Sequence, residues 1–219
     1  MYTPHRIVFL AFLFLAGCAT KTQTGAVVGA AGGAVVGGVI GKVGGSTAKG
    51  AIIGAVVGGA AGAIIGAQMD QQASELEQSI KGAKVERVGE GIQVTFESGL
   101  LYDFDSDVVR PEAKTNLRQL AASLDKYPGS NLLILGHTDP LGSSAYNLAL
   151  SGRRANSAAR YLRSQGVSGT RTATRGLGET EPIASNETEA GRRANRRVEV
   201  AIFASQEARA AAAPTPESR

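Results

Sequence analysis

Glycine recurs at every fourth position between residues 25 and 66, and this spacing restricts what that part of the chain can fold into. The ladder runs through Gly25, Gly29, Gly33, Gly37, Gly41 and Gly45, and again through Gly50, Gly54, Gly58, Gly62 and Gly66, with mostly Ala, Val and Ile between them. On a helix this spacing places the glycines on one stripe, where a second helix can pack at backbone distance. Each interior glycine costs about 1 kcal/mol relative to alanine, so such a helix needs a packing partner.

We therefore expect residues 25–67 to be a glycine-zipper segment, with two helical arms joined near Lys42 and Lys49. The resulting helical hairpin is expected to lie in or on a membrane, where unpaired backbone is far more costly than poor helix propensity, or to stack with other copies. The alternative is a flexible glycine-rich linker. Such linkers are rich in Ser and polar residues, whereas this segment is rich in Val and Ile.

The residues before the ladder are typical of an export signal. Residues 1–17 have a short basic start, a short apolar run and then small residues, and the run is too short to span a bilayer. The letters LAGC at 15–18 resemble a bacterial lipobox, which implies that the signal peptide is removed and that lipid is attached to Cys18. Residues 18–24 are then the lipidated N-terminus, and Ala19 favours the outer membrane. The alternative is an ordinary secretory signal with an incidental cysteine.

The rest of the chain changes from a polar segment to an alternating α/β pattern. Residues 68–84 have helical propensity without a wide apolar face, which predicts an exposed spacer helix. Strand patterns then alternate with two amphipathic helices, which predicts an α+β domain over 85–205 with one β-sheet covered by two main helices. Residues 206–219 have little to bury, and we expect a disordered tail.

Individual elements of this domain follow from local patterns. Alternation predicts a strand at Ile92–Phe96, and a continuous apolar run predicts a strand at Leu132–Leu135 that is buried on both faces. The other expected elements are an extended piece at Leu101–Asp105, a helix at Ala113–Leu124 after Pro111, a helix at Ser143–Gln165, and strands at Thr170–Arg175 and Arg197–Phe203. In the second helix the core face is expected to carry Leu148, Ala155, Ala158, Ala159 and Leu162.

Composition excludes several classes of function. The chain has one Cys and two His, which excludes an internal disulfide and a Cys/His metal cluster, and we expect no cofactor. The 23 basic residues are dispersed among 19 acidic ones, so nucleic acid is not an expected partner. No paired-carboxylate, zinc or activated-nucleophile pattern is present, so we do not expect an enzyme.

Polar residues at the end of the Leu132–Leu135 strand are the candidate site. Asp139 follows that strand, and Asn147 and Arg154 share one stripe of the next helix, so Asp139 and Arg154 can converge. An ion pair between Asp139 and Arg154, or Asp139 as a helix cap, explains the spacing equally well.

Three motifs carry a resemblance to a known family. The segments HTDPLG at 137–142, YNLALSGRRA at 146–155 and GRRANRRV at 191–198 resemble the OmpA-like peptidoglycan-binding domain, and the likeness covers roughly 91–204. With the lipobox and the glycine zipper, the chain resembles outer-membrane lipoproteins of the YiaD/Pal-like kind. Gly178 and Glu179 stand where that family frequently has an aromatic residue.

The resemblance implies non-covalent binding of peptidoglycan through the diaminopimelate of its stem peptide. Asp139 is then expected to meet the ammonium group and Arg154 the carboxylate, and a guanidinium fork suits a carboxylate better than a lysine does. The further ligand-binding positions are Thr138, Asn147, Arg196, Tyr102, Asp103 and Phe104, while Arg193 or Arg197 are candidates for structural partners.

The expected partners are peptidoglycan, outer-membrane lipid through Cys18, and a second copy of the chain through the zipper. The binding domain is then periplasmic, and the chain tethers the outer membrane to the wall. The alternative function is an oligomeric envelope assembly or stress factor, driven by the zipper, in which wall binding is secondary.

Overall fold

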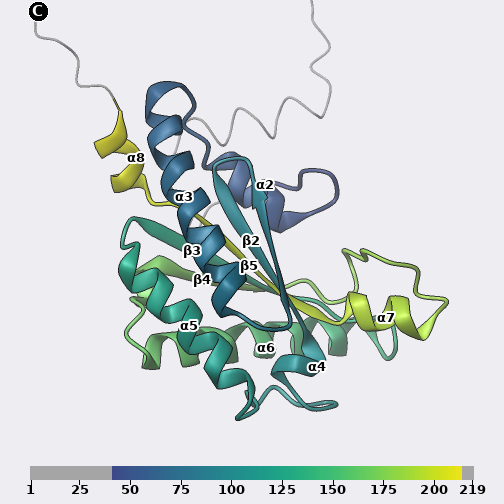
Figure 1. Cartoon of the computed structure of the whole chain (residues 1–219). Helices are drawn as coiled ribbons and strands as arrows, with labels where there is room; N and C mark the ends of the chain where they lie inside the picture. Colours follow the sequence, from purple (N-terminus) through teal and green to yellow (C-terminus); the bar gives the residue numbers. More distant parts are fainter. Residues whose placement is uncertain (1–40, 214–219) are drawn as a thin grey trace, which may run out of the picture.

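One mixed β-sheet organises the chain, and the computed structural model describes residues 41–213 (Figure 1). The strand order is β1-β2-β5-β3-β4, and all neighbours are antiparallel except β3 and β4, which are parallel. The strands are β1 (Ala83–Val88), β2 (Gly91–Glu97), β3 (Ser130–Gly136), β4 (Thr172–Gly176) and β5 (Arg197–Ala204). The expected signal peptide, Cys18 and the first part of the ladder lie outside the described residues.

Helices lie on both faces of this sheet. They are α2 (Thr47–Gly54), α3 (Gly59–Ser79), α4 (Ser98–Leu101), α5 (Ala113–Lys126), α6 (Ser144–Ser164), α7 (Glu189–Asn195) and α8 (Gln206–Ala212), with a 3₁₀ turn at Gly169–Arg171. The expected α+β domain is present. No helix within residues 41–213 combines the length and the apolar character needed to cross a bilayer.

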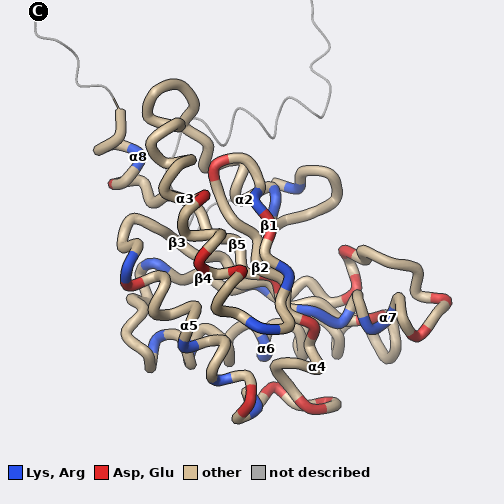
Figure 2. Tube along the Cα trace, in the orientation of Figure 1, with Lys and Arg blue, Asp and Glu red and all other residues tan. Residues whose placement is uncertain are grey.

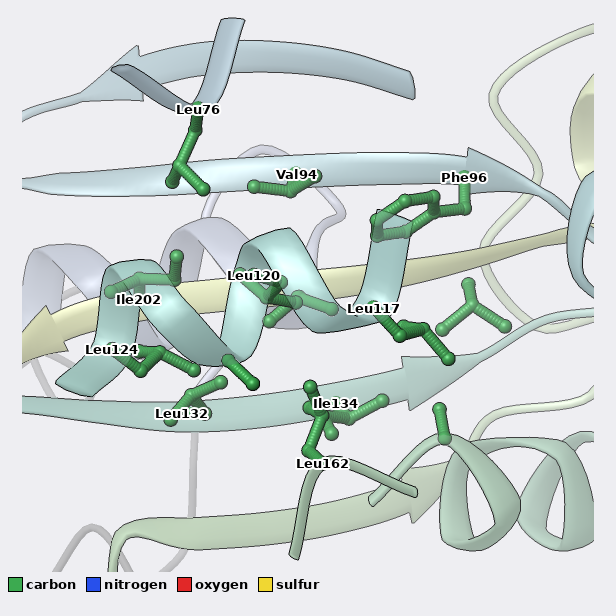
Figure 3. Close-up of a cluster of buried hydrophobic side chains, with 14 of the residues drawn as sticks. Leu76, Val94, Phe96, Leu117, Leu120, Leu124, Leu132, Ile134, Leu162 and Ile202 are labelled. Atoms are coloured by element: carbon green, nitrogen blue, oxygen red, sulfur yellow. The ribbon is translucent and has the colours of Figure 1, made fainter. Parts of the chain in front are cut away.

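The main core lies between the sheet and helices α3, α5 and α6 (Figure 3). Alternate side chains of the strands point to this face, and they include Val94 and Phe96 of β2, Ile134 of β3 and Ile202 of β5. The helices contribute Leu76, Leu117, Leu120, Leu124 and Leu162. The apolar stripe predicted for Ala113–Leu124 is therefore confirmed. Three helices cover this face rather than two, because α3 joins α5 and α6.

The opposite face of the sheet is covered by α2, which comes from the glycine ladder. Ala48, Ala51 and Ile52 of this helix pack against apolar side chains of β3 and β5, including Leu135 and Phe203. Strand β3 is therefore buried on both faces, as its apolar run predicts. This part of the ladder is stabilised in water because the Ala and Ile side chains of α2 are buried against the apolar face of the sheet.

The second run of the ladder is not the single helical arm that we expected. It breaks between α2 and α3, where Gly58 and Gly59 adopt φ angles of 71° and 62°. These backbone conformations are accessible to glycine and disfavoured for other residues. Gly50 and Gly54 therefore belong to one helix and Gly62 and Gly66 to another. The prediction of one continuous helical arm over 50–66 is therefore wrong, and the first arm of the expected hairpin lies largely outside the described residues.

The exposed spacer helix expected at 68–84 is also not observed. Helix α3 continues from the ladder to Ser79, and Met69, Gln72, Ala73 and Leu76 are buried in it. These positions form one stripe at i, i+3, i+4 and i+7, and the polar Gln72 within the stripe concealed it. Gln72 is satisfied in the core, since its Nε2 donates to Ser123 Oγ at 3.1 Å and its Oε1 accepts from Ser130 Oγ at 3.3 Å.

Three smaller expectations are corrected. The piece expected to be extended at Leu101–Asp105 instead begins at the end of α4, and only Tyr102 pairs with Val109 as an isolated bridge. In α6, Leu148 is 53% exposed, because the core face of the helix passes through Leu150 instead. The expected tail begins with helix α8, which Ser205 caps by accepting a hydrogen bond from the Ala208 N–H.

Candidate functional site

The site is built where β3 ends and α6 begins, and a close backbone contact sets its geometry. A Cβ atom placed on Gly136 would lie 2.0 Å from the Ser151 carbonyl oxygen, so only glycine lets α6 approach the strand this closely. The chain then continues through His137, Thr138 and Asp139 beside the first turns of α6. Ser143 caps that helix by accepting a hydrogen bond from the Tyr146 N–H.

Asp139 is buried and held by groups from three segments. Its Oδ1 accepts a hydrogen bond from the Leu141 N–H at 3.1 Å, and its backbone oxygen accepts one from Asn147 Nδ2 at 3.2 Å. Its Oδ2 lies 2.5 Å from Arg196 Nη1, and Arg196 Nη2 lies 2.6 Å from Glu189 Oε1. The carboxylate of Asp139 is thus paired with Arg196, and not with Arg154.

Arg154 is 5% exposed and forms no ion pair with any carboxylate in the described residues. Its Nε donates to the Ser106 carbonyl at 2.8 Å and its Nη2 to the Asp103 carbonyl at 3.4 Å. The guanidinium also lies over the Tyr102 ring at 5.4 Å from the centroid. Burial lowers the pKa of Arg154, although arginine stays charged in proteins. The alternative of an Asp139–Arg154 ion pair is therefore not observed.

The three positions expected at 102–104 have different roles. Tyr102 is buried, its hydroxyl donates to the Arg154 carbonyl at 2.7 Å, and burial raises its pKa, so it supports the helix that carries Arg154. The Asp103 backbone contacts Arg154, while its carboxylate lies 3.7 Å from Arg110. Phe104 is 99% exposed. Asp103, Asp105 and Asp107 occupy alternate positions in this loop after α4, which Figure 2 draws with several acidic segments.

Asn147 and Thr138 complete the cluster around Asp139. Asn147 is buried, and its Nδ2 donates to Glu179 Oε2 at 2.7 Å as well as to Asp139. The Thr138 N–H donates to the Gly178 carbonyl at 2.9 Å, and its buried hydroxyl has no partner in the structure. Glu179 was missed as a candidate. The sequence indicates that Glu179 is unusual in one way: it lies where the OmpA-like family frequently has an aromatic residue.

A second polar cluster lies behind the site, toward α2. Arg197 and Glu199 are both buried, with Arg197 Nε 2.7 Å from Glu199 Oε1, so Arg197 is a structural residue rather than a ligand. His137 is also buried here. Burial and the charge of Arg197 lower the pKa of His137 to about 3, which keeps its imidazole neutral at pH 7. No group of three or more possible metal ligands occurs within the described part of the chain.

Fold and site together define a small binding domain. An α+β sheet domain presents a carboxylate with its own counter-ion and, on the same helix as Asn147, a buried guanidinium that lacks one. This arrangement leaves a buried guanidinium that can receive an anionic group.

Comparison with protein families identifies this class. Residues 101–196 match the OmpA family and residues 1–70 match the YMGG-like Gly-zipper. Residues 101–196 therefore form a domain of the OmpA family, which follows a Gly-zipper segment. The OmpA-like domains are peptidoglycan-binding domains and not enzymes. The family expected from the three motifs is confirmed.

Several relatives are envelope proteins. The chain is similar to outer membrane porin F of Pseudomonas fluorescens (42% identity over 111 residues, 51% of this chain and 34% of that protein). It is also similar to the probable lipoprotein YiaD of Escherichia coli K12 (36% over 136 residues, 61% of this chain and 62% of that protein). The chain thus spans between about a third and three fifths of the length of these curated relatives.

Solved structures confirm the fold. The cell wall anchor of the T6SS from Pseudomonas aeruginosa is 32% identical with a TM-score of 0.54, and the match covers 62% of this chain and 96% of that one. A putative MotB-like protein from Desulfovibrio vulgaris has a TM-score of 0.60 at 23% identity, covering 65% of this chain and 95% of that one.

Proposed function

We propose that this chain binds peptidoglycan non-covalently through the diaminopimelate of the stem peptide and tethers the outer membrane to the wall. Asp139 receives the ammonium of the ligand and Arg154 its carboxylate. Thr138, Asn147 and Arg196 line the same end of the sheet. Wall binding agrees with the OmpA-family domain, and one similar structure is named as a cell wall anchor.

The unpaired charge of Arg154 carries the proposal. A buried charge without a counter-ion is costly, and such a charge is retained where a ligand supplies the partner. A carboxylate fits the guanidinium fork with two parallel hydrogen bonds. Asp139 is already paired with Arg196. The ammonium of the ligand therefore has to share the Asp139 carboxylate with Arg196 or displace Arg196 from it.

The anchor at the other end is lipid on Cys18, which lies outside the described residues. Several acyl chains make membrane attachment effectively permanent, since each buried methylene contributes about 0.8 kcal/mol. A weak wall site is then sufficient, because attachment at one end and a repeating lattice at the other raise the effective concentration. This places the binding domain in the periplasm.

Sedimentation with purified peptidoglycan sacculi tests the wall site. The mature full-length chain is expected to sediment with sacculi and to be released by excess free diaminopimelate. Arg154→Ala is expected to weaken binding at least about tenfold, because a charge-assisted hydrogen bond contributes about 1.5–3 kcal/mol. The matched control is Arg153→Ala, which removes a neighbouring guanidinium that is 47% exposed and 3.9 Å from Asp107. Equal binding by the Arg154 and Arg153 variants would disprove the site.

A second proposal is self-association through the zipper segment, and it rests on exposed apolar side chains. Large apolar residues are exposed along 43–64, namely Val43, Ile53, Val56, Val57 and Ile64. Clusters of this kind mark protein or membrane contacts more often than isolated apolar residues do.

Crosslinking of the mature full-length chain tests self-association. Wild type is expected to yield dimers or larger species, and the double variant Ile53→Ser, Val57→Ser is expected to lose them, because the apolar contact area is reduced. Val108→Ser, at a more exposed position outside this segment, serves as the control. A monomeric wild type, or unchanged crosslinking of the double variant, contradicts the proposal.

A further inference from the structure

One loop contacts both the candidate wall site and the ladder helix α2. We call residues 177–183, which follow β4, the bridging loop. On the side of the wall site, its Gly178 N–H donates to Ser151 Oγ at 2.9 Å. Its Glu179 carboxylate accepts from Asn147 Nδ2 and from Ser144 Oγ, both at 2.7 Å. These bonds attach the loop to the helix that carries the candidate ligand-binding residues.

Two residues further on, the loop is attached to the ladder. The buried Glu181 carboxylate accepts from the Thr47 N–H at 3.1 Å and from Thr47 Oγ1 at 2.6 Å. Lys42 Nζ lies 2.9 Å from the same carboxylate. The Glu181 backbone oxygen accepts from Arg197 Nη2 at 3.0 Å, so the loop also rests on β5. The three contacts of the Glu181 carboxylate, two with Thr47 and one with Lys42, hold the start of α2 against the domain.

A single residue, Thr180, separates the two anchored carboxylates of the loop, Glu179 and Glu181. If α2 leaves the sheet, the Glu181 carboxylate loses its contacts with Thr47 and Lys42, and a carboxylate without these donors turns toward water. A movement at Glu181 displaces Glu179 two residues away. Asn147 then loses one of the two acceptors that orient its amide, while Asp139 keeps Arg196.

We propose that Glu181 is a positioning residue for the wall site, through which docking of the ladder helix α2 sets the affinity for peptidoglycan. The inference rests on the proposed function of Asp139, Asn147 and Arg154. Glu181 touches no ligand in this scheme. It acts by keeping Glu179 against Asn147. The zipper segment thus regulates the strength of the wall contact.

A double-mutant cycle in the mature full-length chain tests the link. Glu181→Gln keeps the shape of the side chain and removes its charge, and Thr47→Val removes the hydroxyl that it binds. Each variant is expected to weaken sacculus binding roughly threefold to thirtyfold, the range found for coupling through contact networks. The double variant is expected to bind about as weakly as Glu181→Gln alone, because the Thr47 hydroxyl is one of the contacts that Glu181→Gln already weakens.

A spectroscopic measurement separates positioning from a general loss of stability. The side-chain amide NMR signals of Asn147 are expected to shift in Glu181→Gln and in Thr47→Val, as the bond to Glu179 weakens. Binding is compared at a temperature where every variant is folded, as followed by circular dichroism. Glu86→Gln is the matched control, since Glu86 pairs with Lys84 on β1 and makes no side-chain hydrogen bond or ion pair to α2 or the bridging loop.

The outcomes distinguish the inference from the proposed function. If Arg154→Ala loses binding while Glu181→Gln binds as wild type, or if Thr47→Val has no effect, the inference is wrong and the wall site stands. If wild type does not bind sacculi, the proposed function is wrong, and the Asn147 signals still decide whether Glu181 positions this side chain. Unmoved Asn147 signals overturn the inference in either case.

Discussion

Replacing Arg197 with alanine is expected to lower the free energy of unfolding by about 3–5 kcal/mol, the usual cost of removing one partner from a buried ion pair. Arg197 is 2% exposed and its Nε lies 2.7 Å from Glu199 Oε1. Without the guanidinium, the buried Glu199 carboxylate loses its ion-pair partner, and its Oε2 already lacks a hydrogen-bond partner in the structure. The bond to the Glu181 carbonyl is lost as well.

Urea unfolding followed by circular dichroism measures this loss. Arg153→Ala is the control, because this side chain is 47% exposed, its pair with Asp107 is a surface pair at 3.9 Å, and its loss is expected to change stability by no more than about 1 kcal/mol. Replacing both members of the buried pair with apolar residues, as in Arg197→Met with Glu199→Leu, is expected to recover most of the stability. A loss below about 1 kcal/mol for Arg197→Ala would show that the pair is not desolvated as the structure has it.

Gly136→Ala is expected to destabilise the fold strongly, although it adds only one methyl group. The added Cβ would lie 2.0 Å from the Ser151 carbonyl oxygen and 2.7 Å from its carbonyl carbon. Both are backbone atoms of α6, so neither can rotate away, and the strand and the helix have to separate. Overpacking of this kind costs about 1–3 kcal/mol or more. We also expect weaker sacculus binding, because Asp139 follows this strand and Arg154 lies on this helix.

Unfolding and sedimentation of the same variant check both parts of this expectation. Gly66→Ala in α3 is the control, and for this variant we expect an increase in the free energy of unfolding. A Cβ there meets nothing within 4 Å, and alanine favours a helix over glycine by about 1 kcal/mol. If Gly136→Ala proves as stable as wild type, then α6 does not pack on the end of β3 in the manner described.

Much of the domain is predictable from short patterns. The strand at Ile92–Phe96 and the helix at Ala113–Leu124 follow from periodicities of two and of three to four residues, and both are observed. The burial of helix α3 does not follow from its sequence, because Gln72 interrupts an otherwise apolar stripe. Its burial depends on Ser123 and Ser130, which are 51 and 58 residues away in the sequence. No local pattern reveals such a partner.

The candidate site, too, is predictable from the sequence only in part. The motifs identify Asp139, Asn147 and Arg154, and α6 does place the last two on one stripe. Their partners could not be predicted. Arg196 pairs with Asp139 from 57 positions away, and Glu179, which holds Asn147, lies in a loop without periodicity. The opposite charges of Asp139 and Arg154 suggested that they meet, whereas the structure assigns each of them other contacts.

Spacing over a few residues is enough to predict β2, β3, β4 and β5, helices α5 and α6, and the charged residues at the end of β3. The position of the glycine ladder between residues 41 and 66 depends instead on tertiary contacts. A stripe of small residues packs equally well against lipid, another helix or a sheet, so its spacing does not specify a partner. Here β3 and β5 present an apolar face, and Glu181, 134 positions from Thr47, supplies the hydrogen bonds that hold α2 on it.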